Sequence, residues 1–150
     1  MLFRSIDSMD LPVTKDTVLV MKNCGPKGAP GFPEWGHIPM PKVLLEQGVP
    51  DMVRISDARM SGTSFGTVVL HAAPESALGG ALAVVQNGDE VQLDVAGRQI
   101  ELLVPAEEIH RRLQSFTPAA PKYDRGYGRM FLEHVTQANL GCDFDFLRKV

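Results

Sequence analysis

The sequence predicts a small α+β domain that is mainly β-structure with short helices. Several short runs of apolar and β-branched residues are typical of strands. Many of these runs are separated by segments rich in the chain's 14 glycines and 11 prolines, which are typical of turns. Two other segments begin with a proline followed by helix-forming residues, as short helices do. Many short strands joined by such turns favour a small barrel or a sandwich.

The N-terminal half is predicted to combine strands with one helix and one long irregular loop. Seven of the twelve residues in 25–36 (GPKGAPGFPEWG) are Gly or Pro, so this glycine loop is predicted to be neither helix nor regular strand. Residues 41–48 predict a short helix, with a proline in the first turn and a glycine at the stop. The apolar runs predict strands over residues 17–23, 49–56 and 67–74.

The C-terminal half is predicted to contain a β-meander followed by two helices. Its three strands are predicted over residues 81–86, 90–95 and 99–104. Asn87-Gly88 indicates a tight turn between the first two. Alternating apolar residues in the second and third strands predict one buried face. A helix over 105–114, a linker over 115–125 and an amphipathic helix over 127–138 follow, and then an aromatic tail.

Composition limits the class of protein. The 150 residues, 44% hydrophobic and 22% charged, fit one soluble domain over residues 1–150. The net charge of −3 gives no general attraction to nucleic acid or anionic membranes. The sequence has neither a ~20-residue apolar span nor the apolar centre of a secretory signal. Cys24 and Cys142 are isolated, so no disulfide framework is expected. We therefore expect a cytoplasmic protein that binds neither nucleic acid nor membrane.

Two polar segments are candidate sites. The glycine loop could bring backbone N–H groups and the carboxylate of Glu34 to a ligand, or it could be a rigid surface connection. Residues 56–66 (SDARMSGTSFG) follow a predicted strand, where a loop is well placed to supply a site. There Ser61 could expose its hydroxyl on a tight turn, and Asp57 and Arg59 could pair or bind a ligand carboxylate. The alternative is a turn whose hydroxyls satisfy their own backbone.

Histidine, cysteine and tryptophan give weaker signals. The four histidines share no metal-ligand spacing with one another or with cysteine, and only His37, just beyond the glycine loop, is a candidate. Cys24 is predicted to be a small buried hydrophobe rather than a nucleophile. Trp35 is predicted to be a packing anchor.

Four motifs together resemble a known family: NCGPKGAPGFPE, VPDMVRISDARMSGTSFG, HAAPESALGGALAVVQNGD and RGYGRMFLEHVTQANLGCDFDFL. They are similar to the C-terminal domain of the dihydroxy-acid and sugar-acid dehydratases, a family that includes the branched-chain dihydroxy-acid, phosphogluconate and aldonate dehydratases. PEWGHIPMPKVLLEQG and SDARMSGT are most similar to the pentonate (arabinonate-like) branch. The branched-chain branch is closer to TDGRFSG at that point.

The resemblance implies a hydro-lyase that converts a 2,3-dihydroxy sugar acid to a 2-keto-3-deoxy acid, with an iron–sulfur cluster and magnesium. It also implies a fold like the swivelling β-barrel domain of the aconitase group. By its place in the motifs, Ser61 matches the base that removes the C2 proton, Glu34 matches a magnesium ligand, and Thr63 is placed to contact substrate. Serine is a poor base unless a nearby cation or backbone dipole stabilises its alkoxide, and magnesium beside a Ser-Gly turn supplies that setting.

In the family, the cluster cysteines and the other magnesium ligands belong to a long N-terminal domain whose motifs do not match this sequence. We therefore expect that this domain is absent, and that the isolated chain binds neither cofactor and is inactive unless the domain is supplied separately. In the family this domain is covered by the N-terminal domain and by a partner subunit, so the resemblance implies an exposed apolar face on the helix over 127–138 and the tail CDFDFL, and a homo-oligomer is expected. Three alternatives stay open: a branched-chain dihydroxy-acid dehydratase fragment, a stand-alone domain that binds a small carboxylate or a partner without catalysis, and a truncated product without function.

Overall fold

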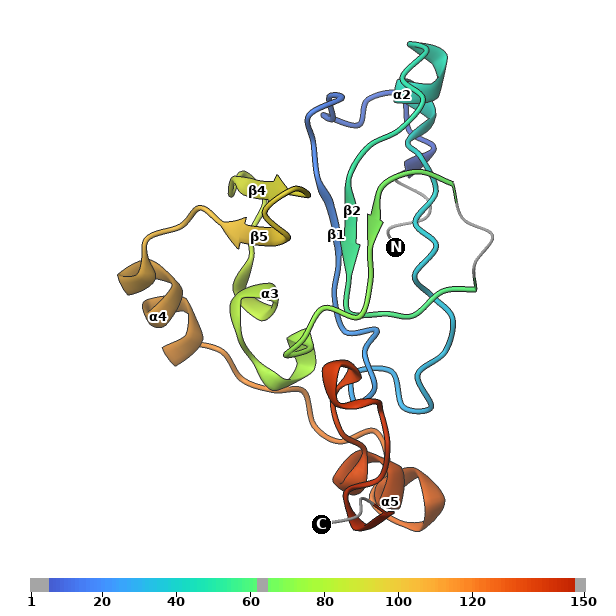
Figure 1. Cartoon of the computed structure of the whole chain (residues 1–150), viewed down its shortest axis with the longest axis vertical. Helices are drawn as coiled ribbons and strands as arrows, with labels where there is room; N and C mark the ends of the chain where they lie inside the picture. The colour runs from blue at the N-terminus through green and yellow to red at the C-terminus, as the bar shows by residue number, and fades with distance from the viewer. Residues whose placement is uncertain (1–5, 62–64, 148–150) are drawn as a thin grey trace.

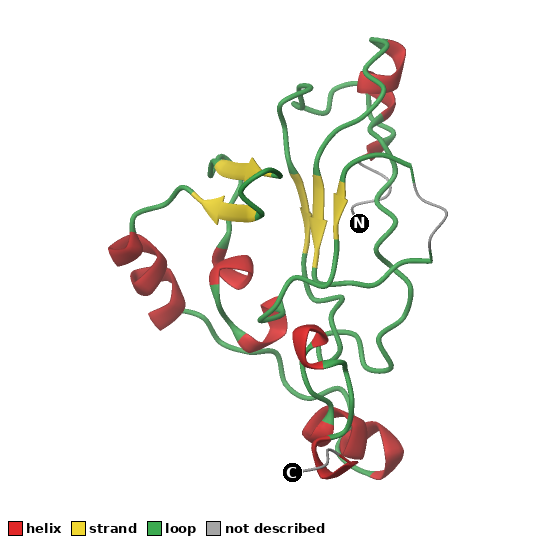
Figure 2. Cartoon of the chain, viewed as in Figure 1, coloured by secondary structure: helices red, strands yellow, loops and turns green. Residues whose placement is uncertain are grey.

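The computed structural model describes residues 6–61 and 65–147, and it confirms a small α+β domain with short helices and two small sheets (Figures 1 and 2). The first sheet has the strand order β1 (Leu19–Met21), β2 (Arg54–Ser56) and β3 (Val68–Val69). Both pairings are parallel, with Arg54 of β2 opposite Leu19 of β1 and Val68 of β3. Each strand is shorter than predicted: β1 lies at the centre of its predicted segment, β2 at the end and β3 near the start. The unpaired parts of the segments that contain β2 and β3 include Pro50 and Pro74, which lack a backbone N–H for a ladder.

The parallel arrangement decides where the loops go. Because the three strands run the same way, their carboxyl ends meet at one edge of the sheet. The glycine loop leaves this edge after β1, and the segment from Asp57 to Thr67 leaves it after β2. In Figure 1 this edge faces the C-terminal helix α5 (Gly126–His134). The sequence predicted the strands but not their parallel pairing.

The second sheet is an antiparallel hairpin of β4 (Val91–Asp94) and β5 (Gln99–Leu102), as predicted. Val91 pairs with Leu102, and Asp94 pairs with Gln99. The Asp94 carboxylate accepts a hydrogen bond from the Gly97 N–H at 2.8 Å, which stabilises the turn.

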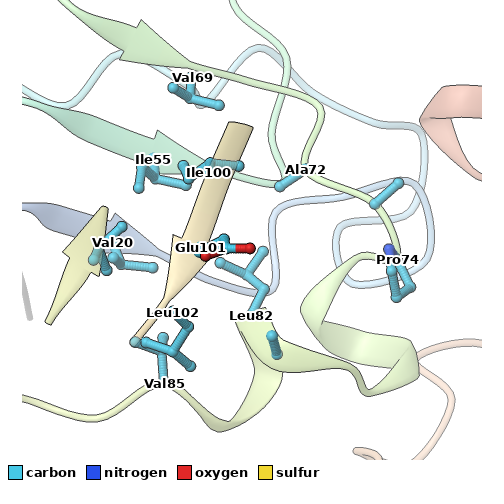
Figure 3. Close-up of a pocket in the computed structure, with 13 residues that line it drawn as sticks. Val20, Ile55, Val69, Ala72, Pro74, Leu82, Val85, Ile100, Glu101 and Leu102 are labelled. Atoms are coloured by element: carbon cyan, nitrogen blue, oxygen red, sulfur yellow. The ribbon is translucent and has the colours of Figure 1, made fainter. Parts of the chain in front are cut away.

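An apolar hollow of about 280 Å³ separates the hairpin from the parallel sheet (Figure 3). The sheet contributes Val20, Ile55 and Val69 to its lining, and the hairpin contributes Val91, Ile100 and Leu102. Over the described ranges, therefore, the two sheets are separate and no closed barrel is seen, which corrects the predicted barrel. Among the described residues, Glu101 is the only charged one in the lining. No described residue of the glycine loop or of the segment between β2 and β3, residues 57–67 (the Ser61 loop), lines the hollow.

The predicted strand over 81–86 is wrong, because Ala81–Val84 form the short helix α3. A short apolar run does not distinguish a strand from a buried helical turn, and Ala and Leu favour helix. The Lys22 ammonium donates hydrogen bonds to the Ala83 and Val85 carbonyls, at 3.1 and 3.0 Å, which satisfies groups at the end of this helix. The turn at Asn87-Gly88 therefore joins a helix to a strand rather than two strands.

The other predicted helices are confirmed with shorter bounds: α2 (Lys42–Glu46), α4 (Ala106–Gln114) and α5. Helix α5 ends before 138 because Val135 adopts an extended conformation and bridges to Phe144 of the tail. The Phe144 ring contacts Phe131 of α5 edge-on, at 5.8 Å between ring centroids. The tail thus docks partly on α5, while Phe146 and Leu147 stay exposed. The homo-oligomer stays a prediction.

The core is small and unusually polar. Leu44, Met52 and Ile55 are buried apolar side chains. Asp57, Glu75 and Arg54 are also buried, which is rare for charged residues unless hydrogen bonds satisfy them. The 3₁₀ helix η1 (Ser76–Leu78) begins next to Glu75. In the described part of the chain, no helix has the length and apolar character of a membrane span.

Helix α4 is joined to the rest of the domain by an ion-pair network. The Arg112 guanidinium donates to the Asp89 carboxylate at 2.6 and 3.0 Å and to Glu108 at 2.8 Å. Hydrogen bonds from Arg111 first, and then from Arg112, lower the pKa of Glu108 from 4.5 to about 2. A carboxyl group with a lowered folded-state pKa adds stability above its unfolded pKa and loses it as the pH falls.

Glu108→Gln should therefore lower the thermal midpoint relative to the wild type at neutral pH. The difference should shrink as the pH falls from about 4.5 to about 2, because the wild-type carboxylate is protonated over that range. Thermal unfolding across this pH series tests the prediction, with exposed Glu107→Gln as the matched control. A difference that does not change with pH would contradict it.

Candidate functional site

The glycine loop and the Ser61 loop are in direct contact. The Gly36 N–H donates a hydrogen bond to the Arg59 carbonyl at 2.8 Å. A side chain at Gly36 would place a Cβ only 2.8 Å from that oxygen and 2.7 Å from Leu70 Cδ2. The absence of a side chain at residue 36 therefore allows the two loops to approach this closely.

Arg59 bridges the two loops through its side chain. Its Nε donates to the Phe32 carbonyl, and its guanidinium lies 5.8 Å from the centroid of the Phe32 ring. Its Nη1 lies 3.5 Å from Glu34 Oε1, and the two side chains are 44% and 49% exposed. Because both partners are exposed, this ion pair contributes little stability, about 0–1 kcal/mol. Its main consequence is that it orients Glu34 toward the Ser61 loop.

Ser61 lies two residues beyond Arg59 and is exposed. The structure therefore brings the loops that carry Ser61 and Glu34 together through Arg59 and Gly36. Thr63 lies outside the described residues. The catalytic, metal-binding and substrate-binding roles of Ser61, Glu34 and Thr63 stay predictions.

The returning end of the Ser61 loop is fixed by a buried arginine. Arg54 Nη2 donates hydrogen bonds to the Phe65 carbonyl at 2.5 Å and to the Asp51 carboxylate at 3.1 Å. Arg54 Nη1 donates to the Ile38 carbonyl at 2.9 Å. Asp51 in turn accepts hydrogen bonds from the Thr67 N–H and hydroxyl at 2.7 and 2.8 Å. Burial raises the pKa of Asp51, but the Thr67 hydrogen bonds and other contacts outweigh it, so the net pKa is below its usual value.

The start of both loops is organised by the fully buried carboxylate of Asp57. It accepts hydrogen bonds from the Cys24 N–H at 2.9 Å, the Asn23 N–H at 3.2 Å, and the N–H and hydroxyl of Ser76 at 2.9 and 2.6 Å. Asp57 therefore joins the segments that follow all three strands. Of the two possibilities for Asp57 and Arg59, a mutual ion pair is not formed, since Arg59 pairs with Glu34. Binding of a ligand carboxylate stays a prediction.

A second buried carboxylate, Glu75, holds the glycine loop. It accepts hydrogen bonds from the Lys27 N–H at 2.9 Å and from the Gly28 N–H at 2.7 Å. A Cβ at Gly25 would lie 2.6 Å from Glu75 Oε2, so the carboxylate fits only against a glycine there. The loop was predicted as a possible donor of N–H groups to a ligand, but Glu75 occupies these two.

The weaker sequence candidates have mixed outcomes. Cys24 is buried, and burial, together with the charge of Asp57, raises the pKa of its thiol to about 11, which confirms a buried, unreactive cysteine. Trp35 is 56% exposed, so the predicted packing role is wrong. His37 is exposed beside the glycine loop. His71, which the sequence did not single out, contacts the Phe32 ring at 5.5 Å.

Glu75 was missed because its partners are distant in sequence. A usable signal was nevertheless present: Glu75 is the only acid between Val68 and Val85, a segment whose only other polar side chains are His71 and Ser76. A single acid in such a segment indicates a buried carboxylate that needs donors from elsewhere in the chain.

The chain's residues fit the two cofactors implied by the sequence to different degrees. Within residues 6–61 and 65–147, no three His, Cys, Asp or Glu side chains gather as a metal site. The Glu34 carboxylate, an accessible hard oxygen ligand, fits magnesium as one ligand, since Mg²⁺ is often held by one or two carboxylates and by substrate. Burial raises the pKa of both the Cys24 and Cys142 thiols, and two thiols alone do not fit an iron–sulfur cluster.

Polar loops gathered at the carboxyl edge of a parallel sheet define a domain suited to binding or converting a small molecule. The family described as dihydroxy-acid/6-phosphogluconate dehydratase C-terminal matches residues 2–142. The chain belongs to this family, as the sequence motifs predicted.

Proteins similar to this chain include three dehydratases. It is 54% identical to a 6-deoxy-6-sulfo-D-gluconate dehydratase of Pseudomonas putida over 98% of this chain and 25% of that protein. It is 51% identical to an L-arabonate dehydratase of Azospirillum brasilense over 95% and 26% of the two chains. It is 33% identical to a dihydroxy-acid dehydratase of Saccharolobus islandicus over 93% of this chain and 24% of that protein. The chain thus spans about a quarter of the length of the curated relatives it matches.

Proposed function

We propose that this chain is the C-terminal domain of a sugar-acid dehydratase, which removes water from a 2,3-dihydroxy acid to give a 2-keto-3-deoxy acid. The observation that carries the proposal is the family match over residues 2–142. Identity to relatives named as sugar-acid dehydratases is 51–54%, against 33% for the dihydroxy-acid dehydratase, which supports a sugar acid rather than a branched-chain substrate.

The chemistry assigns one proton transfer to this chain. Ser61 Oγ, as its alkoxide, would take the proton from C2 of the substrate, and the electron pair of that bond would form a C2=C3 double bond as hydroxide leaves from C3. The hydroxide takes up a proton and is released as water, and the resulting enol tautomerises to the 2-keto-3-deoxy acid. Magnesium at Glu34 would stabilise negative charge on the substrate carboxylate and C2 oxygen. Arg59, two residues before the serine, would add positive charge to this edge of the domain, which makes the serine alkoxide easier to form. Thr63 would contact the substrate.

The rest of the active site would come from outside these residues. We propose that a separate N-terminal dehydratase domain supplies the iron–sulfur cluster and the remaining magnesium ligands. The present domain would act as the swivelling domain of the assembled cytoplasmic enzyme, with its loop edge facing that partner. The exposed apolar residues of the tail, Phe146 and Leu147, favour a homo-oligomer, which light scattering of the assembled enzyme would test.

A chimeric enzyme tests the proposed function. Residues 2–142 replace the corresponding quarter of the Azospirillum brasilense L-arabonate dehydratase, and keto-acid formation from L-arabonate and other aldonates is measured. We expect turnover of an aldonate within about tenfold of the parent, and none from the parent that lacks this quarter. The isolated chain is the second control, and it should be inactive.

Two results would overturn the proposal. A folded chimera that assembles but converts no aldonate would exclude a sugar-acid dehydratase domain. Turnover of a branched-chain dihydroxy acid in preference to every aldonate would instead support the branched-chain alternative.

A further inference from the structure

Gln137 makes a two-way contact with the buried carboxylate that holds the glycine loop. Its side-chain Nε2 donates to Glu75 Oε1 at 2.6 Å, and its Oε1 accepts from the Glu75 backbone N–H at 2.7 Å. An amide is suited to this place because it both donates and accepts. A carboxylate there would face Glu75 with like charge. Gln137 therefore fixes both the backbone and the side chain of Glu75.

The effect of this contact continues along the glycine loop. Glu75 holds the N–H groups of Lys27 and Gly28. Successive turns then lead toward Glu34, with the Ala29 N–H bonded to the Gly25 carbonyl at 2.9 Å and the Phe32 N–H to Ala29 at 2.8 Å. Hydrogen bonds and the short stretches of backbone between them therefore connect Gln137 to Phe32, two residues before Glu34.

Gln137 is itself held firmly by the C-terminal segment. Its backbone carbonyl accepts from the Leu140 N–H at 2.9 Å and from the Cys142 N–H at 3.2 Å, around the 3₁₀ helix η2 (Ala138–Leu140). A second hydrogen bond joins the glycine loop to the C-terminal part of the chain: Lys27 Nζ donates to the Glu133 carbonyl of α5 at 3.5 Å. Figure 1 places this C-terminal segment below the carboxyl edge of the parallel sheet.

We propose that Gln137 is a positioning residue, which acts through Glu75 and the glycine loop to set the place of Glu34. The C-terminal segment is then part of the site's support rather than only a docking surface. This inference rests on the proposed function, because it assumes that Glu34 binds magnesium there.

The first test needs no activity and uses the chain itself. Amide hydrogen exchange at Lys27 and Gly28 is measured by NMR in the wild type and in Gln137→Ala. We expect roughly tenfold faster exchange at both amides in the variant, because their acceptor loses a hydrogen bond that involves a charged group. The matched control is Asn139→Ala, which removes an exposed amide from the same 3₁₀ helix. Equal exchange rates in the two variants would overturn the inference.

The second test uses the chimeric enzyme and separates positioning from general damage. We expect Gln137→Ala to raise the magnesium concentration for half-maximal activity roughly tenfold, with kcat at saturating magnesium changed less than threefold. Asn139→Ala should change neither. An unchanged magnesium requirement in an active enzyme would overturn the positioning role and leave the proposed function standing. If the wild-type chimera does not dehydrate any aldonate, the proposed function is wrong, and so is the magnesium-binding role of Glu34. That conclusion does not depend on the exchange rates of the Lys27 and Gly28 amides.

Discussion

For the proposed base, Ser61→Ala should lower kcat of the chimeric enzyme by roughly a thousandfold or more, the scale expected when a positioned base is removed. The variant keeps the Ser61 loop, because that loop is held by the Arg59 carbonyl at one end and by Arg54 and Asp51 at the other. The substrate should still bind, so KM should change little. Steady-state kinetics on an aldonate measure both constants.

Ser115→Ala is the matched control, since this serine lies at the exposed end of α4, on a different part of the domain from both loops. It should keep kcat within about twofold of the wild type. A Ser61→Ala enzyme that retains a tenth or more of the wild-type kcat would contradict the assignment of Ser61 as the base.

The largest effect on stability is expected for Asp57→Ala. The Asp57 carboxylate is fully buried and accepts hydrogen bonds from Cys24, Asn23 and Ser76. The shorter side chain leaves the Cys24 and Ser76 N–H groups buried without an acceptor, while the Asn23 N–H keeps the Ser76 hydroxyl, and each buried group without an acceptor costs roughly 1–3 kcal/mol. We expect a loss of at least about 3 kcal/mol from the free energy of unfolding, a large share of the ~5–15 kcal/mol that stabilises a typical domain.

Urea unfolding of the isolated chain measures this effect. Asp124→Ala, at an exposed position between α4 and α5, is the matched control and should change the free energy of unfolding by less than about 0.5 kcal/mol. Equal unfolding midpoints for the two variants would show that the Asp57 hydrogen bonds do not organise the fold.

Local signals in the sequence predicted the local elements well. The alternating residues of the hairpin and the proline-led start of α4 were sufficient to place both. The segment 81–86 failed because its apolar residues suit a helix as well as a strand. The parallel sheet was beyond reach for a different reason: its partners, such as Leu19 and Arg54, are far apart in sequence and no turn between them fixes their pairing.

For the candidate site too, local sequence patterns predicted the loops but not the groups that support them. The glycine loop and the Ser61 loop were identified from their composition, and the structure brings them into contact through Gly36 and Arg59. The supporting groups were not predicted, because Glu75 binds residues 47 and 48 positions earlier and Gln137 binds Glu75 across 62 positions. The single acid in the segment from Val68 to Val85 indicates that Glu75 needs donors, but no pattern in neighbouring residues says which groups supply them.

A crystal structure of the assembled dehydratase with magnesium and a bound sugar acid would test the shared site of Ser61 and Glu34 most directly. We expect Ser61 Oγ to lie ~3 Å from substrate C2, the range for proton transfer. We expect a Glu34 carboxylate oxygen ~2.1 Å from a magnesium ion that also binds the substrate. A substrate and metal bound elsewhere, with Ser61 and Glu34 facing solvent or opposite sides of the domain, would contradict the shared site.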